Sequence, residues 1–195
     1  MHGGQSVPNF DYAMAEGVKK TYRKQYFRAL AQYIEVRFDM SASDAAALTA
    51  AIKEALGTDV TMHTAEAYAE KLRAFLPRHQ AENGFQIITG DAARAAAEYA
   101  AKTAYKETDA TTYQAMEALV HNLNTMNSRA GAQVPFSSLN YGTDTSPEGR
   151  MAVHNLLRAT EAGLGDGETP IFPVQIFKVK EGVNYNEGDP NYDLF

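Results

Sequence analysis

The chain has 195 residues, of which 45% are hydrophobic and 22% charged, proportions typical of a folded globular domain and unlike those of a disordered segment. Its 18 Lys and Arg against 24 Asp and Glu give a formal net charge of −6, which argues against a nucleic-acid-binding or membrane-surface protein, because both need clustered positive charge. Cysteine is absent, which excludes disulfides, thiolate zinc sites, iron–sulfur ligation, cysteine nucleophiles and thiyl radicals within these residues.

Neither a membrane span nor a secretion signal is predicted. No apolar run approaches the roughly 20 residues that a spanning helix needs, and residues 1–10 lack a charged segment followed by an apolar one. A cytoplasmic location is therefore expected.

The first predicted element is a long amphipathic helix over residues 11–38. Its apolar residues recur mostly at intervals of three and four, the spacing of one helix face: Val18, Tyr22, Tyr26, Leu30, Tyr33 and Ile34. The other face holds a local group of cations inside an acidic protein: Lys19, Lys20, Arg23, Lys24 and Arg28. A solvated helix face would by itself account for these cations, because Lys and Arg are good helix formers.

Further helices follow along the first two thirds of the chain. The alanine-rich residues 41–76 predict two short helices, the first capped at residues 43–44 (Ser-Asp) and ended by Gly57. Another helix is predicted to begin near Asp91, and residues 108–109 (Thr-Asp) predict the cap of one more, which reaches about residue 126.

The pattern then changes to strand, helix and strand. Residues 133–141 combine strand-forming side chains with partial alternation. Ser146-Pro147-Glu148 supplies an N-cap, a proline and an acidic first turn, so a helix is predicted from there to near Gly163. Residues 171–179 predict a second, mostly buried strand. These elements form a βαβ unit with parallel strands, and the expected fold class is α/β.

Three possible chemistries find little support. The five histidines, at positions 2, 63, 79, 121 and 154, show no metal-ligand spacing, so no metal site is predicted. The glycine-rich residues 163–167 follow a helix rather than a strand, which favours a turn over a dinucleotide-binding loop. Ser137 and Ser138 lack the Gly-x-Ser-x-Gly motif of a hydrolase.

Two loops are better candidates for ligand contact. Residues 127–133 place the guanidinium of Arg129 and the amide of Gln133 among small residues, a composition suited to a polar ligand; an ordinary connecting loop is the alternative. Residues 142–146 enter a helix N-terminus, where free backbone N–H groups can hold an anion. Simple capping by Ser146 is the alternative there.

At these loops the sequence resembles the anaerobic ribonucleoside-triphosphate reductases, the class III or glycyl-radical type. The resemblance rests on residues 122–146 (NLNTMNSRAGAQVPFSSLNYGTDTS), with three further blocks in the same order. These blocks are residues 2–12 (HGGQSVPNFDY), residues 167–173 (GETPIFP), and residues 180–184 (KEGVN) leading to 189–193 (DPNYD). Residues 41–107 match no motif of the family and are interpreted as a variable helical region.

The resemblance implies a helix-rich part of a ten-stranded α/β barrel that reduces ribonucleoside triphosphates to deoxyribonucleotides. The family uses a glycyl radical made by an S-adenosylmethionine iron–sulfur activase, a structural zinc and often formate as reductant. The barrel cysteines, the glycyl-radical motif, the zinc cysteines and the ATP cone have no counterpart in this sequence. Residues 1–195 are therefore interpreted as a partial barrel domain, a fragment without catalytic residues, cofactor or metal of its own and inactive alone.

The resemblance also suggests ligand-binding residues and partners. The segment 128–133 resembles the loop that relays effector identity to the substrate pocket, and Lys24 is a candidate for effector phosphate. The candidate residues for effector or substrate binding are Lys24, Arg129, Gln133, Ser137, Asn140 and Ser146. The implied partners are ribonucleoside triphosphates, nucleotide effectors, a second large subunit and the activase.

Two rival functions stay open. One is a nucleotide-binding or dimerisation module without catalysis, which the missing cysteines favour for the isolated chain. The other is a different glycyl-radical enzyme, such as a formate-lyase type, against which the PFSS and GTDTS blocks argue. A piece of a barrel also leaves strand edges uncovered, so the isolated chain is expected to associate or aggregate.

Overall fold

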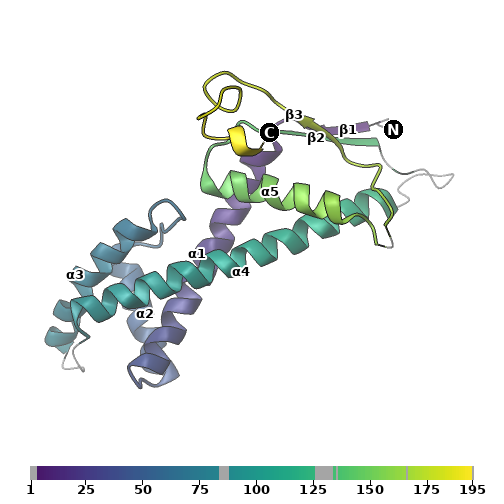
Figure 1. The fold of residues 1–195 in the computed structure, drawn as a ribbon. Helices are drawn as coiled ribbons and strands as arrows, with labels where there is room; N and C mark the ends of the chain where they lie inside the picture. Colours follow the sequence, from purple (N-terminus) through teal and green to yellow (C-terminus); the bar gives the residue numbers. More distant parts are fainter. Residues whose placement is uncertain (1–3, 84–87, 126–133, 135, 166, 195) are drawn as a thin grey trace. The chain divides into compact units, whose positions relative to one another are not determined.

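The computed structural model describes residues 4–83, 88–125, 134, 136–165 and 167–194. Figure 1 shows the described elements in chain order: β1 (Gly4–Val7), α1 (Phe10–Arg37), α2 (Ala42–Leu56), α3 (Ala65–Asn83), α4 (Gly90–Thr125), β2 (Phe136–Tyr141), α5 (Pro147–Ala162), β3 (Val174–Phe177) and the 3₁₀ turn η1 (Tyr192–Leu194). The chain divides into two compact units. We call Lys19–Thr108 the helical unit, and Met1–Val18 with Asp109–Phe195 the sheet unit.

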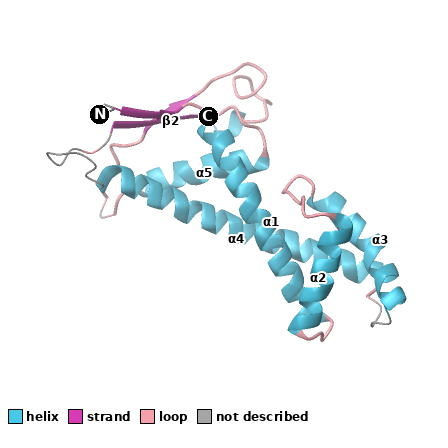
Figure 2. Ribbon diagram, turned by 180° about the vertical axis from the view of Figure 1, so that it is seen from behind, coloured by secondary structure: helices cyan, strands magenta, loops and turns pink. Residues whose placement is uncertain are grey.

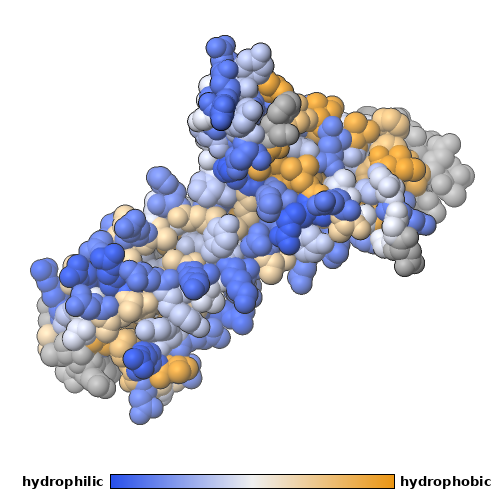
Figure 3. Space-filling view, viewed as in Figure 1, coloured by the Kyte–Doolittle hydropathy of each residue, from blue (hydrophilic) through white to orange (hydrophobic). Residues whose placement is uncertain are grey.

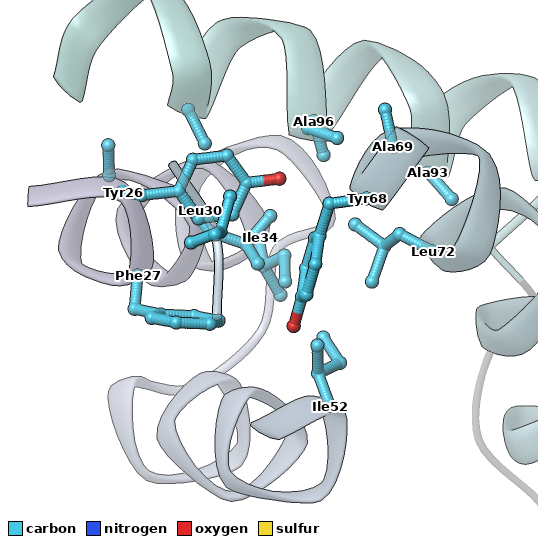
Figure 4. Close-up of a cluster of buried hydrophobic side chains, with 14 of the residues drawn as sticks. Tyr26, Phe27, Leu30, Ile34, Ile52, Tyr68, Ala69, Leu72, Ala93 and Ala96 are labelled. Carbon is cyan, nitrogen blue, oxygen red and sulfur yellow. The ribbon is translucent and has the colours of Figure 1, made fainter. Parts of the chain in front are cut away.

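The core of the helical unit is built from large side chains of α1, α2 and α3 packed against alanines of α4 (Figure 4). Tyr26 and Tyr68 meet edge to face with ring centroids 5.7 Å apart. The Tyr68 hydroxyl donates to the carbonyl oxygen of Gly57 at 2.9 Å, so the ring also fixes the end of α2. Ala93 and Ala96 lie in the same cluster; because alanine has only a methyl group, α4 can approach the other helices closely.

The predicted helices are confirmed, with two corrections. The N-cap of α2 is Ser41, whose hydroxyl accepts the Asp44 N–H, and not Ser43 or Asp44. The two helices expected after Asp91 are one continuous helix, α4. Thr108 lies near the middle of this helix, and its side chain is buried. No glycine or proline interrupts residues 91–125, so nothing in the local sequence stops the helix there. Gly57 ends α2 with a φ of 78°, as expected.

The sheet unit contains three parallel strands in the order β1-β2-β3. Its α5 lies along one face of the sheet (Figure 2). Ser146 caps α5 and Gly163 ends it, as the sequence predicts. The parallel pairing of β2 with β3 confirms the predicted arrangement, and the described helices and small parallel sheet are compatible with an α/β class.

Two features of the sheet differ from the expectations. The strand β1 was not predicted; it is four exposed residues paired with β2, a partner about 130 positions away, so the local sequence gives no signal for it. The strand β3 covers only Val174–Phe177 and alternates between exposed and half-buried residues. It is an edge strand, and Pro173 has no N–H with which to extend the pairing.

The sheet leaves apolar side chains exposed. Phe136, Ile171, Val174 and Ile176 are exposed by 61%, 77%, 41% and 43%, and Figure 3 shows apolar surface gathered over the sheet unit. Among the described residues, no helix has the length and hydropathy needed to cross a membrane.

Candidate functional site

The helical unit has a groove of about 520 Å³ between α1 and α2. Half of the ten residues that line it are cationic: Lys20, Arg23, Lys24 and Arg28 from α1, and Lys53 from α2. No Asp or Glu is among the residues that line it. In a chain with a net charge of −6, this groove concentrates positive potential, which attracts anions. We call it the basic groove.

Two contacts hold cations of the basic groove in place. The Lys53 ammonium lies 4.8 Å from the centre of the Phe27 ring, a cation–π distance. Arg23 Nη2 donates to Asp59 Oδ1 at 2.7 Å. The Nε of Arg23 is buried and has no hydrogen-bond partner among the described residues.

Phosphate groups are the ligands that fit the basic groove best. Lys ammonium and Arg guanidinium groups form charge-assisted hydrogen bonds with phosphate oxygens, and the apolar lining from Phe27, Ala31 and Ala46 offers a surface for a base or sugar. Lys24, the candidate from the sequence, lines this groove and is exposed.

In the sheet unit, Ser137 and Asn140 of β2 point to opposite faces of the sheet, because they are separated by an odd number of positions. Ser137 lies on the face of Leu139 and Tyr141, where its hydroxyl is buried without a described partner. Asn140 pairs in register with Ile176 on the other face, and its Oδ1 also lacks a described partner. The structure therefore does not bring these two candidates to one surface.

Links between side chains tie the Ser137 face of the sheet to α5. The Tyr141 hydroxyl donates to Gln175 Oε1 at 2.6 Å, and Gln175 Nε2 donates to Thr160 Oγ1 of α5 at 2.7 Å. Burial raises the pKa of Tyr141 to about 12, so its hydroxyl stays a donor throughout the neutral range.

The backbone N–H groups of residues 142–144 already hold an anion, the carboxylate of Asp11. Asp11 is fully buried, and its Oδ2 accepts hydrogen bonds from Gly142, Thr143 and Asp144, each at 2.9 Å. Ser146 Oγ accepts the Gly149 N–H and caps α5. The backbone N–H groups of this loop therefore bind an internal carboxylate, and its Ser146 caps a helix.

The carbonyl groups of the same loop are bound by two asparagines from the end of the chain. Asn184 Nδ2 donates to the Gly142 carbonyl at 2.8 Å, and Asn191 Nδ2 donates to the carbonyls of Gly142 and Asp144. Arg150 Nη1 donates to Asn191 Oδ1 at 2.8 Å. We call Asp11, Asn184, Asn191 and the loop they bind the loop clamp.

Arg150 extends the loop clamp to η1. Its Nη2 lies 2.6 Å from Asp193 Oδ2, and this hydrogen bond lowers the pKa of the Asp193 carboxyl. The described residues contain no group of three or more His, Asp or Glu side chains that could hold a metal ion.

The motif blocks of the chain agree with a family-wide comparison. The sequence profile of the family described as anaerobic ribonucleoside-triphosphate reductase matches residues 1–195. The chain belongs to this family. Proteins named anaerobic ribonucleoside-triphosphate reductase are similar to it: that of Escherichia coli is 39% identical over 83 residues, and that of Enterobacteria phage T4 is 41% identical over 92.

The similarity to these reductases covers part of each chain. The aligned stretch is 42% of this chain and 12% of the Escherichia coli protein, and 47% of this chain and 15% of the phage protein. The Salmonella typhimurium reductase is 37% identical over 92 residues, which are 13% of its length. The chain therefore spans a small part of the curated relatives it matches.

The sequence predicted a cationic face on α1, with Lys24 as a candidate for effector phosphate, but neither the groove that α1 forms with α2 nor the loop clamp. Arg129 and Gln133 lie outside the described residues. Asp11, Asn184 and Asn191 occur in the motif blocks, yet no role was assigned to them, because their partners are distant along the chain. The sequence signal that could have pointed to these three residues is that each is a polar residue beside apolar or turn residues within its motif block.

Proposed function

We propose that this chain is part of an anaerobic ribonucleoside-triphosphate reductase that converts ribonucleoside triphosphates to deoxyribonucleoside triphosphates by radical chemistry for DNA synthesis. The observation that carries the proposal is the match of the family profile to residues 1–195. The parallel sheet and its helices are compatible with part of the ten-stranded barrel of this family. The reaction would take place in the cytoplasm.

Within that enzyme, the basic groove binds the phosphates of a nucleotide effector. Five cations and the absence of acidic residues from the lining support this role. The segment 128–133, with Arg129 and Gln133, acts as the loop that relays effector identity to the substrate. Asn140, on the face of β2 that α5 does not cover, is the strand residue best placed for substrate contact.

The radical and metal chemistry is assigned to no residue of this chain. The sequence has no cysteine, and the described residues offer no cluster for a metal ion, so the residues present do not fit the family's zinc or thiyl groups. In this proposal the glycyl radical, its S-adenosylmethionine activase, the zinc and formate act with other parts of the enzyme. A second large subunit is the further partner.

The groove assignment is tested by titrating deoxynucleoside triphosphates into the protein made from the complete reading frame. Lys24→Ala should weaken effector binding about tenfold, because one charge-assisted phosphate contact contributes roughly 1.4 kcal/mol. Lys71→Ala is the matched control, since Lys71 is exposed on α3 and does not line the groove. Raised salt should weaken binding to the unaltered protein.

Equal affinity of the Lys24→Ala and Lys71→Ala proteins would reject the groove as the effector site. The reaction itself is tested by anaerobic reduction of a labelled ribonucleoside triphosphate by the same complete protein with its activase. Binding of effectors without any reduction would instead favour the non-catalytic nucleotide-binding module.

A further inference from the structure

One cation of the basic groove is already paired with a carboxylate of the chain. Arg23 lines the groove, and its Nη2 donates to Asp59 Oδ1 at 2.7 Å. Asp59 does not line the groove itself, although Thr58, the residue before it, does. An internal anion therefore engages one of the cations that the proposed function assigns to phosphate.

The stability of the fold does not account for this ion pair. The side chains of Arg23 and Asp59 are exposed by 37% and 88%, and ion pairs between exposed side chains contribute little to the free energy of folding. Water and salt screen both charges at this position. The pair is therefore weak enough for a ligand to replace it.

The residues beside Asp59 are held in place by other contacts. The carbonyl of Gly57 accepts the Tyr68 hydroxyl at 2.9 Å, and Val60 is fully buried in the core of the helical unit. These contacts keep the backbone at Asp59 close to Arg23 independently of the ion pair. A change confined to the Asp59 carboxylate should therefore leave the surrounding structure intact.

A carboxylate and a phosphate bind a guanidinium through the same kind of charge-assisted hydrogen bond. A guanidinium forms two parallel bonds through either its Nε–Nη2 edge or its Nη1–Nη2 edge, and both edges include Nη2. Asp59 thus competes for the nitrogen that a two-bond phosphate contact uses. Its negative charge also offsets the contribution of Arg23 to the potential of the groove.

We propose that Asp59 is an internal competitor for phosphate in the basic groove, an autoinhibitory contact that holds Arg23 until a ligand displaces it. The inference rests on the proposed function and adds a regulatory residue to that site. Binding exchanges one anion for another at Arg23, so the free energy needed to displace Asp59 is subtracted from the affinity of the groove.

The test is isothermal titration of inorganic tripolyphosphate into the protein made from the complete reading frame. Asp59→Asn removes the charge but keeps the shape and an acceptor oxygen, and it should tighten binding about three- to fivefold. Asp91→Asn is the matched control. Asp91 is 89% exposed and pairs at 3.3 Å with Arg73, which does not line the groove, so the affinity of this variant should stay unchanged.

A second pair of variants tests whether Asp59 acts through Arg23. Arg23→Gln removes the cation for which carboxylate and phosphate compete, and it should weaken binding by itself. In the Arg23→Gln protein, adding Asp59→Asn should change the affinity little, because the two residues are coupled. An equal increase in both backgrounds would show that Asp59 acts only through the overall field, and it would overturn the competition.

The remaining outcomes also decide the question. Unchanged or weaker binding by Asp59→Asn, or an equal increase in Asp91→Asn, would overturn the proposal; weaker binding would mean that Asp59 orients Arg23 for the ligand. If Arg23→Gln does not fold by circular dichroism, the comparison of Asp59→Asn with Asp91→Asn decides, since both change exposed side chains.

Failure of the proposed function would look different. If Lys24→Ala binds tripolyphosphate as tightly as the unaltered protein, the groove is not the phosphate site, and the effector assignment fails together with this inference. If Lys24→Ala weakens binding while Asp59→Asn leaves it unchanged, the groove assignment stands and the internal competitor alone is rejected.

Discussion

Asp11 shows how strongly one side chain can organise the sheet unit. Its carboxylate lies in the first turn of α1 and accepts three N–H groups of the loop after β2. Hydrogen bonds to a charged acceptor are stronger than neutral ones, and the buried N–H groups of Gly142 and Asp144 would otherwise lose water without compensation. Asp11 therefore joins the N-terminal and middle parts of the chain, beside the pairing of β1 with β2.

We expect Asp11→Ala to lower the free energy of unfolding by about 3 to 5 kcal/mol, because it leaves several backbone donors unsatisfied. Tyr12→Phe is the neighbouring control. It removes only an exposed hydrogen bond from the Tyr12 hydroxyl to the Thr143 carbonyl, at a cost of about 1 kcal/mol or less. Urea unfolding of both variants measures the difference, and equal losses would show that the Asp11 carboxylate is not the main link.

At the scale of elements, two helical glycines have opposite surroundings. Gly149, in the first turn of α5, is tightly enclosed: a Cβ atom there would lie 2.2 Å from Asp144 Oδ2 and 2.5 Å from its Cγ. Asp144 is buried and accepts the Ser146 N–H, so it cannot turn away without losing that bond. Gly17, inside α1, has no atom within 4 Å of such a Cβ.

Gly149→Ala should therefore destabilise the protein by about 1 to 3 kcal/mol through overpacking. Gly17→Ala should stabilise it by about 0.5 to 1 kcal/mol, because alanine is the better helix former and restricts the unfolded chain. Thermal unfolding of the two variants shows directly whether each substitution raises or lowers the stability of the protein. A stabilised Gly149→Ala protein would mean that Asp144 is free to move.

At the scale of the whole molecule, the sheet ends on each side in an edge strand, β1 or β3, whose outer edge is unpaired among the described residues. Unpaired strand edges with exposed apolar side chains are sites of association. The exposed apolar residues Phe136, Ile171, Val174 and Ile176 all belong to this unit. The edges of this sheet are therefore the expected site of the association that the sequence predicts.

The isolated 195-residue chain should elute from size exclusion with a mass that increases with concentration. Ile176→Lys should reduce this association, because it places a charge on an exposed edge strand. Val36→Lys in α1 is the control, since Val36 is 83% exposed and lies outside the sheet unit. A monodisperse monomer at all concentrations, measured by light scattering, would contradict the prediction.

The candidate site was predictable to the extent that its residues act within one element. Lys24 and its neighbouring cations follow from the pattern of a single helix, and the structure places them in one groove. The contribution of Lys53 was not predictable, since it comes from α2. Asn124 lies inside a recognised motif, but its partners Ile171 and Phe172 are 47 and 48 positions away, so the motif alone could not reveal these contacts.

The sequence by itself determined the α/β class, α1 and α5, the ends of α5 and the family, because helical periodicity, capping residues and motifs are local properties. The tertiary structure decided the strand β1, the continuous α4 and the loop clamp. Asp11 and Gly142 are 131 positions apart, and a side chain finds such a partner only when the fold brings the two segments together.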